Sequence, residues 1–89
     1  MRVVRELAYN LFTNCSLALA EGLAIQRVQN HYIRRTNELV DEAEAQAILA
    51  TEGSADAVRA IQGSVNELRA LADALARERG QAAGADPDA

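Results

Sequence analysis

The sequence predicts an all-α protein, and three observations carry that prediction. Proline is absent until Pro87, and no stretch alternates apolar and polar residues with the period of two that marks a strand. In the second half of the chain, large apolar residues recur at intervals of three and four, the spacing that lines one stripe of a helix. This hairpin seam consists of Val58, Ile61, Val65, Leu68 and Leu75, with Ala72 before the last.

The first half of the chain is predicted to form one long helix over about residues 3–51. Two places are compatible with a break: Gly22, and the neighbourhood of Thr36, where two arginines precede a possible cap and several acids follow it. Neither compels one, so the favoured fold is a helical hairpin. The alternative is a three-helix bundle, broken near Gly22 or near Thr36.

The second helix is predicted over about residues 54–79. Gly53 suits the left-handed position just past a helix end, and Ser54 can cap the helix that follows. Asp56 would lie in its first turn, where a negative charge favours the helix dipole. The hairpin therefore turns at Gly53 and Ser54.

The two predicted helices differ in length, and this difference predicts an intermolecular contact. At 1.5 Å per residue the first would be about 70 Å long and the second about 40 Å, so residues 3–25 would overhang. That segment is the most hydrophobic in the chain, and such a surface needs a cover. We therefore expect an oligomeric helical bundle, or a complex with another protein's helix. The expected partner interface consists of Leu7, Leu11, Phe12, Leu19 and Ile25.

Residues 1–79 are predicted to form a single domain, and residues 80–89, with two glycines and Pro87, a disordered tail. Residues 18–20 have the small-x-small form of a signal-peptide cleavage site, but two asparagines interrupt the apolar run before them. The same polar residues argue against a membrane span. We expect a cytoplasmic protein, with membrane attachment through the N-terminal segment and cleavage of a signal left as alternatives.

The composition narrows the function classes. The net charge is −4, which argues against a nucleic-acid-binding domain that works mainly by neutralising phosphates. Every basic residue is arginine and alanine is abundant, as is typical of GC-rich coding in bacteria and phages. The single cysteine, Cys15, excludes an internal disulfide and is expected to be a small buried apolar side chain.

No catalytic constellation, phosphate loop or metal-ligand spacing is found in the sequence. His31 is the only histidine, and Arg34 and Arg35 stand where a helical metal pair would need its second ligand. We therefore expect no enzymatic activity, no metal and no cofactor.

Four residues fall on about one face of a helix and form a candidate contact for an anion or an acidic partner: Arg27, His31, Arg34 and Arg35. The competing interpretation is structural pairing, in the same chain or a neighbour, with the acids that follow. These acids are Glu38, Asp41, Glu42 and Glu44.

Together these observations predict a non-enzymatic helical interaction or assembly protein, in the form of an oligomeric bundle, an adaptor or a small chaperone. Its partner would be a second copy, most simply in a dimer, or another protein's helix. The size and hairpin pattern resemble several groups of small bacterial helical proteins, including secretion-system chaperones and phage accessory proteins. One alternative is a small acidic inhibitor of a protein, of the phage anti-defence type. Another is a nucleic-acid-binding dimer that uses Arg27, Arg34 and Arg35.

Overall fold

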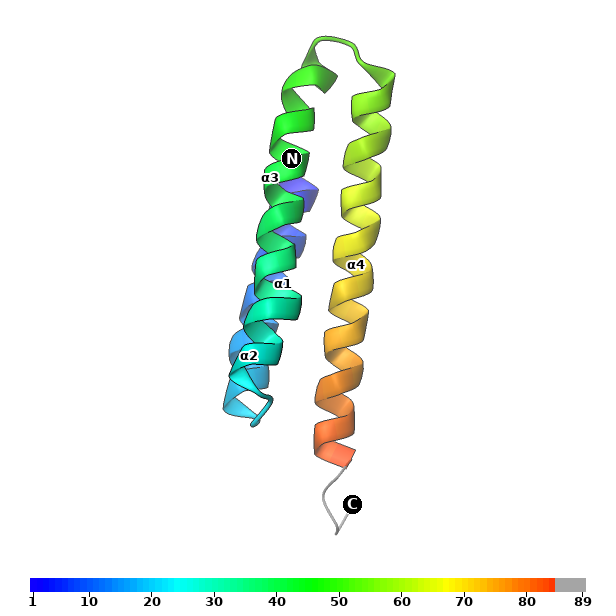
Figure 1. Cartoon of the computed structure of the whole chain (residues 1–89). Coiled ribbons are helices and arrows are strands. Elements are labelled where there is room, and N and C mark those ends of the chain that lie inside the picture. The colour runs from blue at the N-terminus through cyan, green and yellow to red at the C-terminus, as the bar shows by residue number, and fades with distance from the viewer. Residues whose placement is uncertain (85–89) are drawn as a thin grey trace.

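Three long helical segments pack side by side in the computed structural model, which describes residues 1–84, with side chains described up to Gln81 (Figure 1). The all-α class is confirmed, since residues 1–84 contain no strand. The middle segment is continuous but is built from three successive elements. In chain order the elements are α1 (Arg2–Ala20), α2 (Ile25–Arg27), η1 (Val28–Ile33), α3 (Arg34–Thr51) and α4 (Ala55–Gly84).

The chain turns back at Gly22, so the expected continuous helix over residues 3–51 is wrong, and the three-helix alternative is the one that forms. Gly22 has a φ of +98°, in the left-handed region that favours glycine. The N–H of Leu23 donates to the carbonyl of Ala18 at 3.0 Å, a bond that closes the end of α1. No side chain caps the helix that follows, whose N-cap residue is Ala24.

The second turn follows the sequence prediction. Gly53 has a φ of +94°, and the N–H of Ser54 donates to the carbonyl of Leu49 at 3.1 Å, so α3 ends in the same way as α1. The Ser54 hydroxyl then accepts the N–H of Ala57 at 3.1 Å and caps α4.

The possible break near Thr36 and the expected helix end at Arg79 do not form. Thr36 is buried inside the helix, and its hydroxyl donates to the carbonyl of Tyr32 at 2.6 Å instead of capping a new helix. Similarly, α4 does not end at Arg79 but continues through Gly80 to Gly84. The remainder of the expected tail, residues 85–89, lies outside the described residues.

A π-helical stretch, η1, sets the register of the middle segment. The N–H of Arg34 bonds the carbonyl of Gln29, five residues back instead of four. In an α-helix, two successive steps of four residues rotate a side chain by about 80° from its starting face. The wider turn offsets this drift, so Val28, Tyr32 and Thr36 are all buried although they lie four residues apart.

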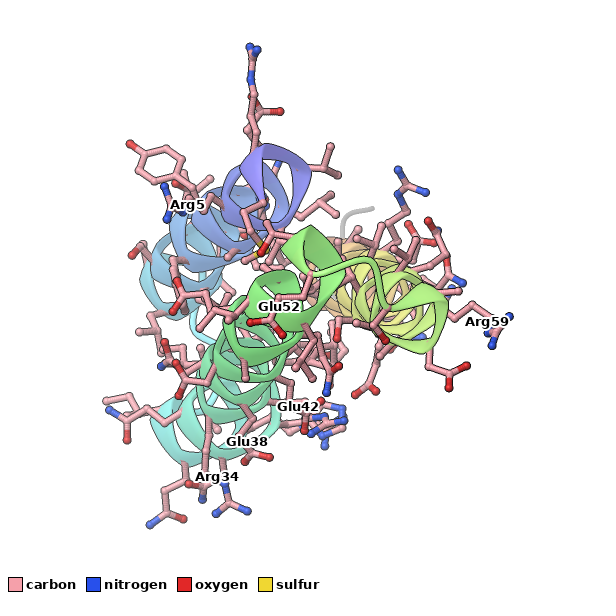
Figure 2. All side chains as sticks on the ribbon, turned by 90° about the horizontal axis from the view of Figure 1, so that it is seen from above. Arg5, Arg34, Glu38, Glu42, Glu52 and Arg59 are labelled. Carbon is pink, nitrogen blue, oxygen red and sulfur yellow. The ribbon has the colours of Figure 1, made fainter. Side chains whose placement is uncertain are left out.

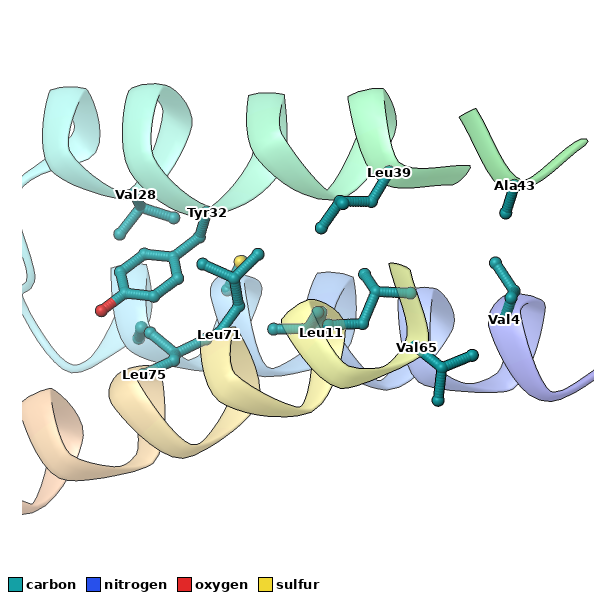
Figure 3. Packing of buried hydrophobic residues seen from close by; sticks show 12 residues of the cluster. Val4, Leu11, Val28, Tyr32, Leu39, Ala43, Val65, Leu71 and Leu75 are labelled. Carbon is teal, nitrogen blue, oxygen red and sulfur yellow. The ribbon is translucent and has the colours of Figure 1, made fainter. Parts of the chain in front are cut away.

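The core runs along the axis where the three segments meet (Figure 3). The middle segment is antiparallel to both α1 and α4, and each pair of long segments is in contact (Figure 1). The buried cluster consists of Val4, Leu11, Cys15, Ala18, Val28, Tyr32, Leu39, Ala43, Val65, Leu68, Leu71 and Leu75.

Most of the predicted hairpin seam lies in this core. Val65, Leu68 and Leu75 are buried, and Ile61 packs against the cluster. Val58 is the exception, at 57% exposed. Leu71, which the 3–4 pattern left out, is buried instead, because α4 contacts two helices and needs a wider apolar face than a two-helix hairpin does.

The predicted partner interface is used inside the chain. Leu11 is fully buried, and Leu7 and Leu19 pack against the core. Phe12 is half-buried, so only Ile25, at 62% exposed, remains largely open. The overhang on which that prediction rested does not form, because the chain turns at Gly22 and α1 packs against the middle segment and α4.

Candidate interaction surfaces

Arg35 is the centre of an ion-pair network between α3 and α4. Its Nη2 donates to Oε1 of Glu67 at 2.8 Å and its Nε to the other carboxylate oxygen. Its Nη1 also lies 3.1 Å from Glu38 and 3.8 Å from Glu42. The hydrogen bonds that Arg35 donates to Glu67 lower the pKa of that carboxyl group, and the bonds it donates to Glu67 and Glu38 raise the pKa of Arg35.

Arg27, Tyr32 and Glu78 form a second link to α4. The Nε of Arg27 lies 2.9 Å from Glu78, and its guanidinium carbon lies 6.0 Å from the centre of the Tyr32 ring. The Tyr32 hydroxyl donates to the same carboxylate. Burial and this bond raise the pKa of Tyr32 to about 12. Burial alone would raise the pKa of Glu78, but the hydrogen bonds from Tyr32 and Arg27 outweigh it and lower that pKa.

The remaining members of the predicted anion contact are more exposed. Arg34 pairs with Glu38 at 3.3 Å on the surface of α3. His31 is exposed, with its ring edge-on to Tyr32 at 4.8 Å between centres. Beside them runs a shallow groove of about 330 Å³. Its lining consists of Asn30, His31, Arg34, Arg35, Glu38, Glu67 and Leu71.

The three arginines of the cluster thus have four carboxylate partners. Structural pairing, the competing interpretation, is what the structure contains, although only Glu38 and Glu42 of the four acids named for it take part. The local pairs with Glu38 and Glu42 follow from helical spacing. The stronger links run to Glu67 and Glu78 on α4, and no local spacing could have indicated them. A third link of this kind joins Arg79 of α4 to Asn14 on α1 and to Glu21, the C-cap residue of α1.

A shallow depression of about 560 Å³ lies on the outer side of α1. Tyr9 is 76% exposed there, and Arg5 forms no ion pair within the described side chains. Figure 2, viewed along the bundle, shows Arg5 on the opposite side of the molecule from Arg59 on α4. We call this surface the α1 face; its residues are Arg5, Glu6, Tyr9, Asn10, Thr13 and Asn14.

An acidic stripe with an apolar centre follows the outer side of α3. Its residues, here called the α3 stripe, are Asp41, Glu44, Ile48 and Glu52, spaced by three and four so that they share one helix face. Ile48 is 64% exposed. None of the three acids forms an ion pair among the described side chains, whereas Glu42 on α3 and Glu67 and Glu78 on α4 each pair with an arginine of the middle segment.

A reactive thiol, a metal site or a membrane span would each require particular features of the described residues. Cys15 lies in the core, as expected, and burial raises the pKa of its thiol. No three metal-binding side chains come together within the described residues. No helix within residues 1–84 combines the length and the apolar character needed to cross a membrane.

No family model, no curated protein and no solved structure matches this chain.

Proposed function

We propose that this protein is a non-enzymatic helical interaction protein that works by presenting exterior helix faces to a protein partner. The observation that carries the proposal is the division of its charges. Glu67 and Glu78 of α4 are paired within the chain by Arg35 and Arg27, whereas the three acids of the α3 stripe have no ion-pair partner among the described side chains and surround an exposed isoleucine. A charged rim around an apolar centre is the composition of a protein interface.

This arrangement supports one of the two alternative functions and gives less support to the other. An acidic inhibitor that docks on a basic protein surface is supported by the same α3 stripe and differs only in what the partner does. Nucleic-acid binding draws less support, because Arg27 and Arg35 would have to leave carboxylates at 2.9 Å and 2.8 Å to neutralise phosphates.

The test is native size analysis of the tagged chain in extracts of its own host. We expect it to migrate well above its monomer mass of 9.6 kDa. Replacing Ile48 and Glu44 together by serine should return it to the monomer position, because both side chains are exposed and their loss leaves the core intact.

The matched control replaces Arg69 and Asp73, exposed residues of α4, by serine and should leave the large species unchanged. A chain that migrates as a monomer in the extract, while remaining helical by circular dichroism, would contradict the proposal.

A further inference from the structure

The α3 stripe and the α1 face have complementary chemistry, and this identifies a partner. Resting on the proposed function, we propose that the partner is a second copy of the chain: the α3 stripe of one copy binds the α1 face of the other. Both surfaces are largely exposed, and within the described chain only Asn14, at the edge of the α1 face, is held by another element, through the bond from Arg79 of α4.

The charges of the two surfaces match. Among the described side chains, the three carboxylates of the α3 stripe form no ion pair, and neither does the guanidinium of Arg5 on the α1 face. Arginine can grip a carboxylate with two parallel hydrogen bonds, which fixes orientation as well as attraction. Like surfaces repel by the same reasoning, so α3 stripe against α3 stripe is disfavoured.

The apolar groups of the two surfaces match as well. Tyr9 is the most exposed of the chain's large apolar side chains and Ile48 is the next, at 76% and 64%. Tyrosine and arginine are the side chains most often found at the energetic centre of protein interfaces. Arg5 and Tyr9 lie four residues apart and so share one helix face, as do Glu44 and Ile48. Each charge is therefore placed one helical turn from an apolar anchor.

Two-fold symmetry doubles the proposed contact. Stable interfaces bury about 800 Å² on each partner, more than one pair of short helix faces supplies. Since every copy carries both surfaces, a two-fold dimer makes the same contact twice and closes without leaving either surface free. The total accessible surface of the chain is 5810 Å², so a standard interface would cover about one seventh of it.

The test is sedimentation equilibrium of purified full chains over a range of micromolar concentrations. We expect the wild-type chain to form a dimer. Arg5→Glu alone, and Asp41→Arg with Glu44→Arg, should each weaken dimerisation at least about tenfold, because like charges then face each other twice in the dimer.

Mixing the two variants gives the decisive result. In a mixed dimer the altered α1 face meets the altered α3 stripe, and the two unaltered surfaces meet each other, so both contacts are complementary again. The mixture should therefore dimerise more strongly than either variant does alone. Arg69→Glu, a charge reversal on α4, is the control and should dimerise like the wild type, with circular dichroism confirming that every variant is folded.

A wild-type chain that stays monomeric throughout, or a mixture that stays monomeric, overturns the inference. The proposed function is judged separately, since a large species in host extracts without a dimer of the purified chain would point to a different protein as the partner.

Discussion

Tyr32 is the residue at which the core and the surface of this protein meet. Its ring is fully buried between the helices, while its hydroxyl reaches Glu78 at the edge of the bundle. With its pKa raised to about 12 by burial and by that carboxylate, the hydroxyl keeps its proton at neutral pH and acts as a donor. One side chain therefore fills the core and also fixes the position of α4.

Replacing Tyr32 by phenylalanine separates these two roles. The ring still fills its space, but Glu78 loses a donor while part of its carboxylate stays buried. We expect the free energy of unfolding to fall by about 1–2 kcal/mol, measured by urea denaturation followed by circular dichroism. Tyr9→Phe, at an exposed position, should change it by less than about 0.5 kcal/mol. Equal stability of Tyr32→Phe and the wild type would show that the hydroxyl contributes nothing.

At the scale of the helices, two left-handed glycines determine the topology. Gly22 and Gly53 each end a helix, and every other φ among the described residues is negative. Glycines inside a helix act differently. At Gly63, in the middle of α4, an added Cβ would meet no heavy atom within 4 Å. Glycine therefore favours the folded state at these turns and disfavours it inside a helix.

This contrast predicts opposite results for one chemical change. Gly63→Ala should raise the free energy of unfolding by about 0.5–1 kcal/mol, since alanine loses less conformational entropy in a helix. Gly22→Ala should lower it by about 1 kcal/mol or more, because its φ of +98° strains a residue with a Cβ. Thermal unfolding would show shifts of several degrees in opposite directions. A stabilised Gly22→Ala would mean that α1 and the middle segment do not turn there.

The sequence was sufficient to predict a helix end where a capping side chain is present. It was insufficient for the uncapped turn and for contacts between distant segments. The turn at Gly53 was predictable because Ser54 supplies a cap, whereas Gly22 is followed by no capping side chain. Thr36 looked like a cap, but its hydroxyl bonds back along its own helix. The seam residues Val65, Leu68 and Leu75, which were singled out by their spacing, lie in the buried core. The links from Arg35 to Glu67 and from Arg79 to Glu21 were not, since they depend on how distant segments pack.

At the scale of the whole molecule, the bundle closes its own core. The apolar side of α1 is covered by the middle segment and by α4, so burial that the hairpin interpretation assigned to a second molecule is supplied within the chain. Any self-association therefore adds to a closed fold and does not complete it. It follows that substitutions in the core should lower the free energy of unfolding, whereas substitutions on the exterior should leave the fold stable.

Two leucines of α1 test this separation. Leu11→Ala removes a fully buried side chain and should cost about 2–5 kcal/mol of unfolding free energy. Leu17→Ala removes a side chain that is 47% exposed and should cost less than about 1 kcal/mol. Urea denaturation of both variants gives the comparison. Similar costs for the two would mean that α1 does not pack in the bundle with the face described above.

The order of the helices along the chain has a consequence for how the protein is made. The middle segment and α4 meet through a short turn, but α1 must wait for α4, as the 58-residue separation of Glu21 and Arg79 shows. At about 5–20 residues per second, a ribosome needs roughly 2–6 seconds to synthesise the 30 residues of α4. Throughout that interval Leu11 and its neighbours are shielded on one side at most. The nascent chain, and not the finished protein, is therefore the species that presents the most apolar surface to its surroundings.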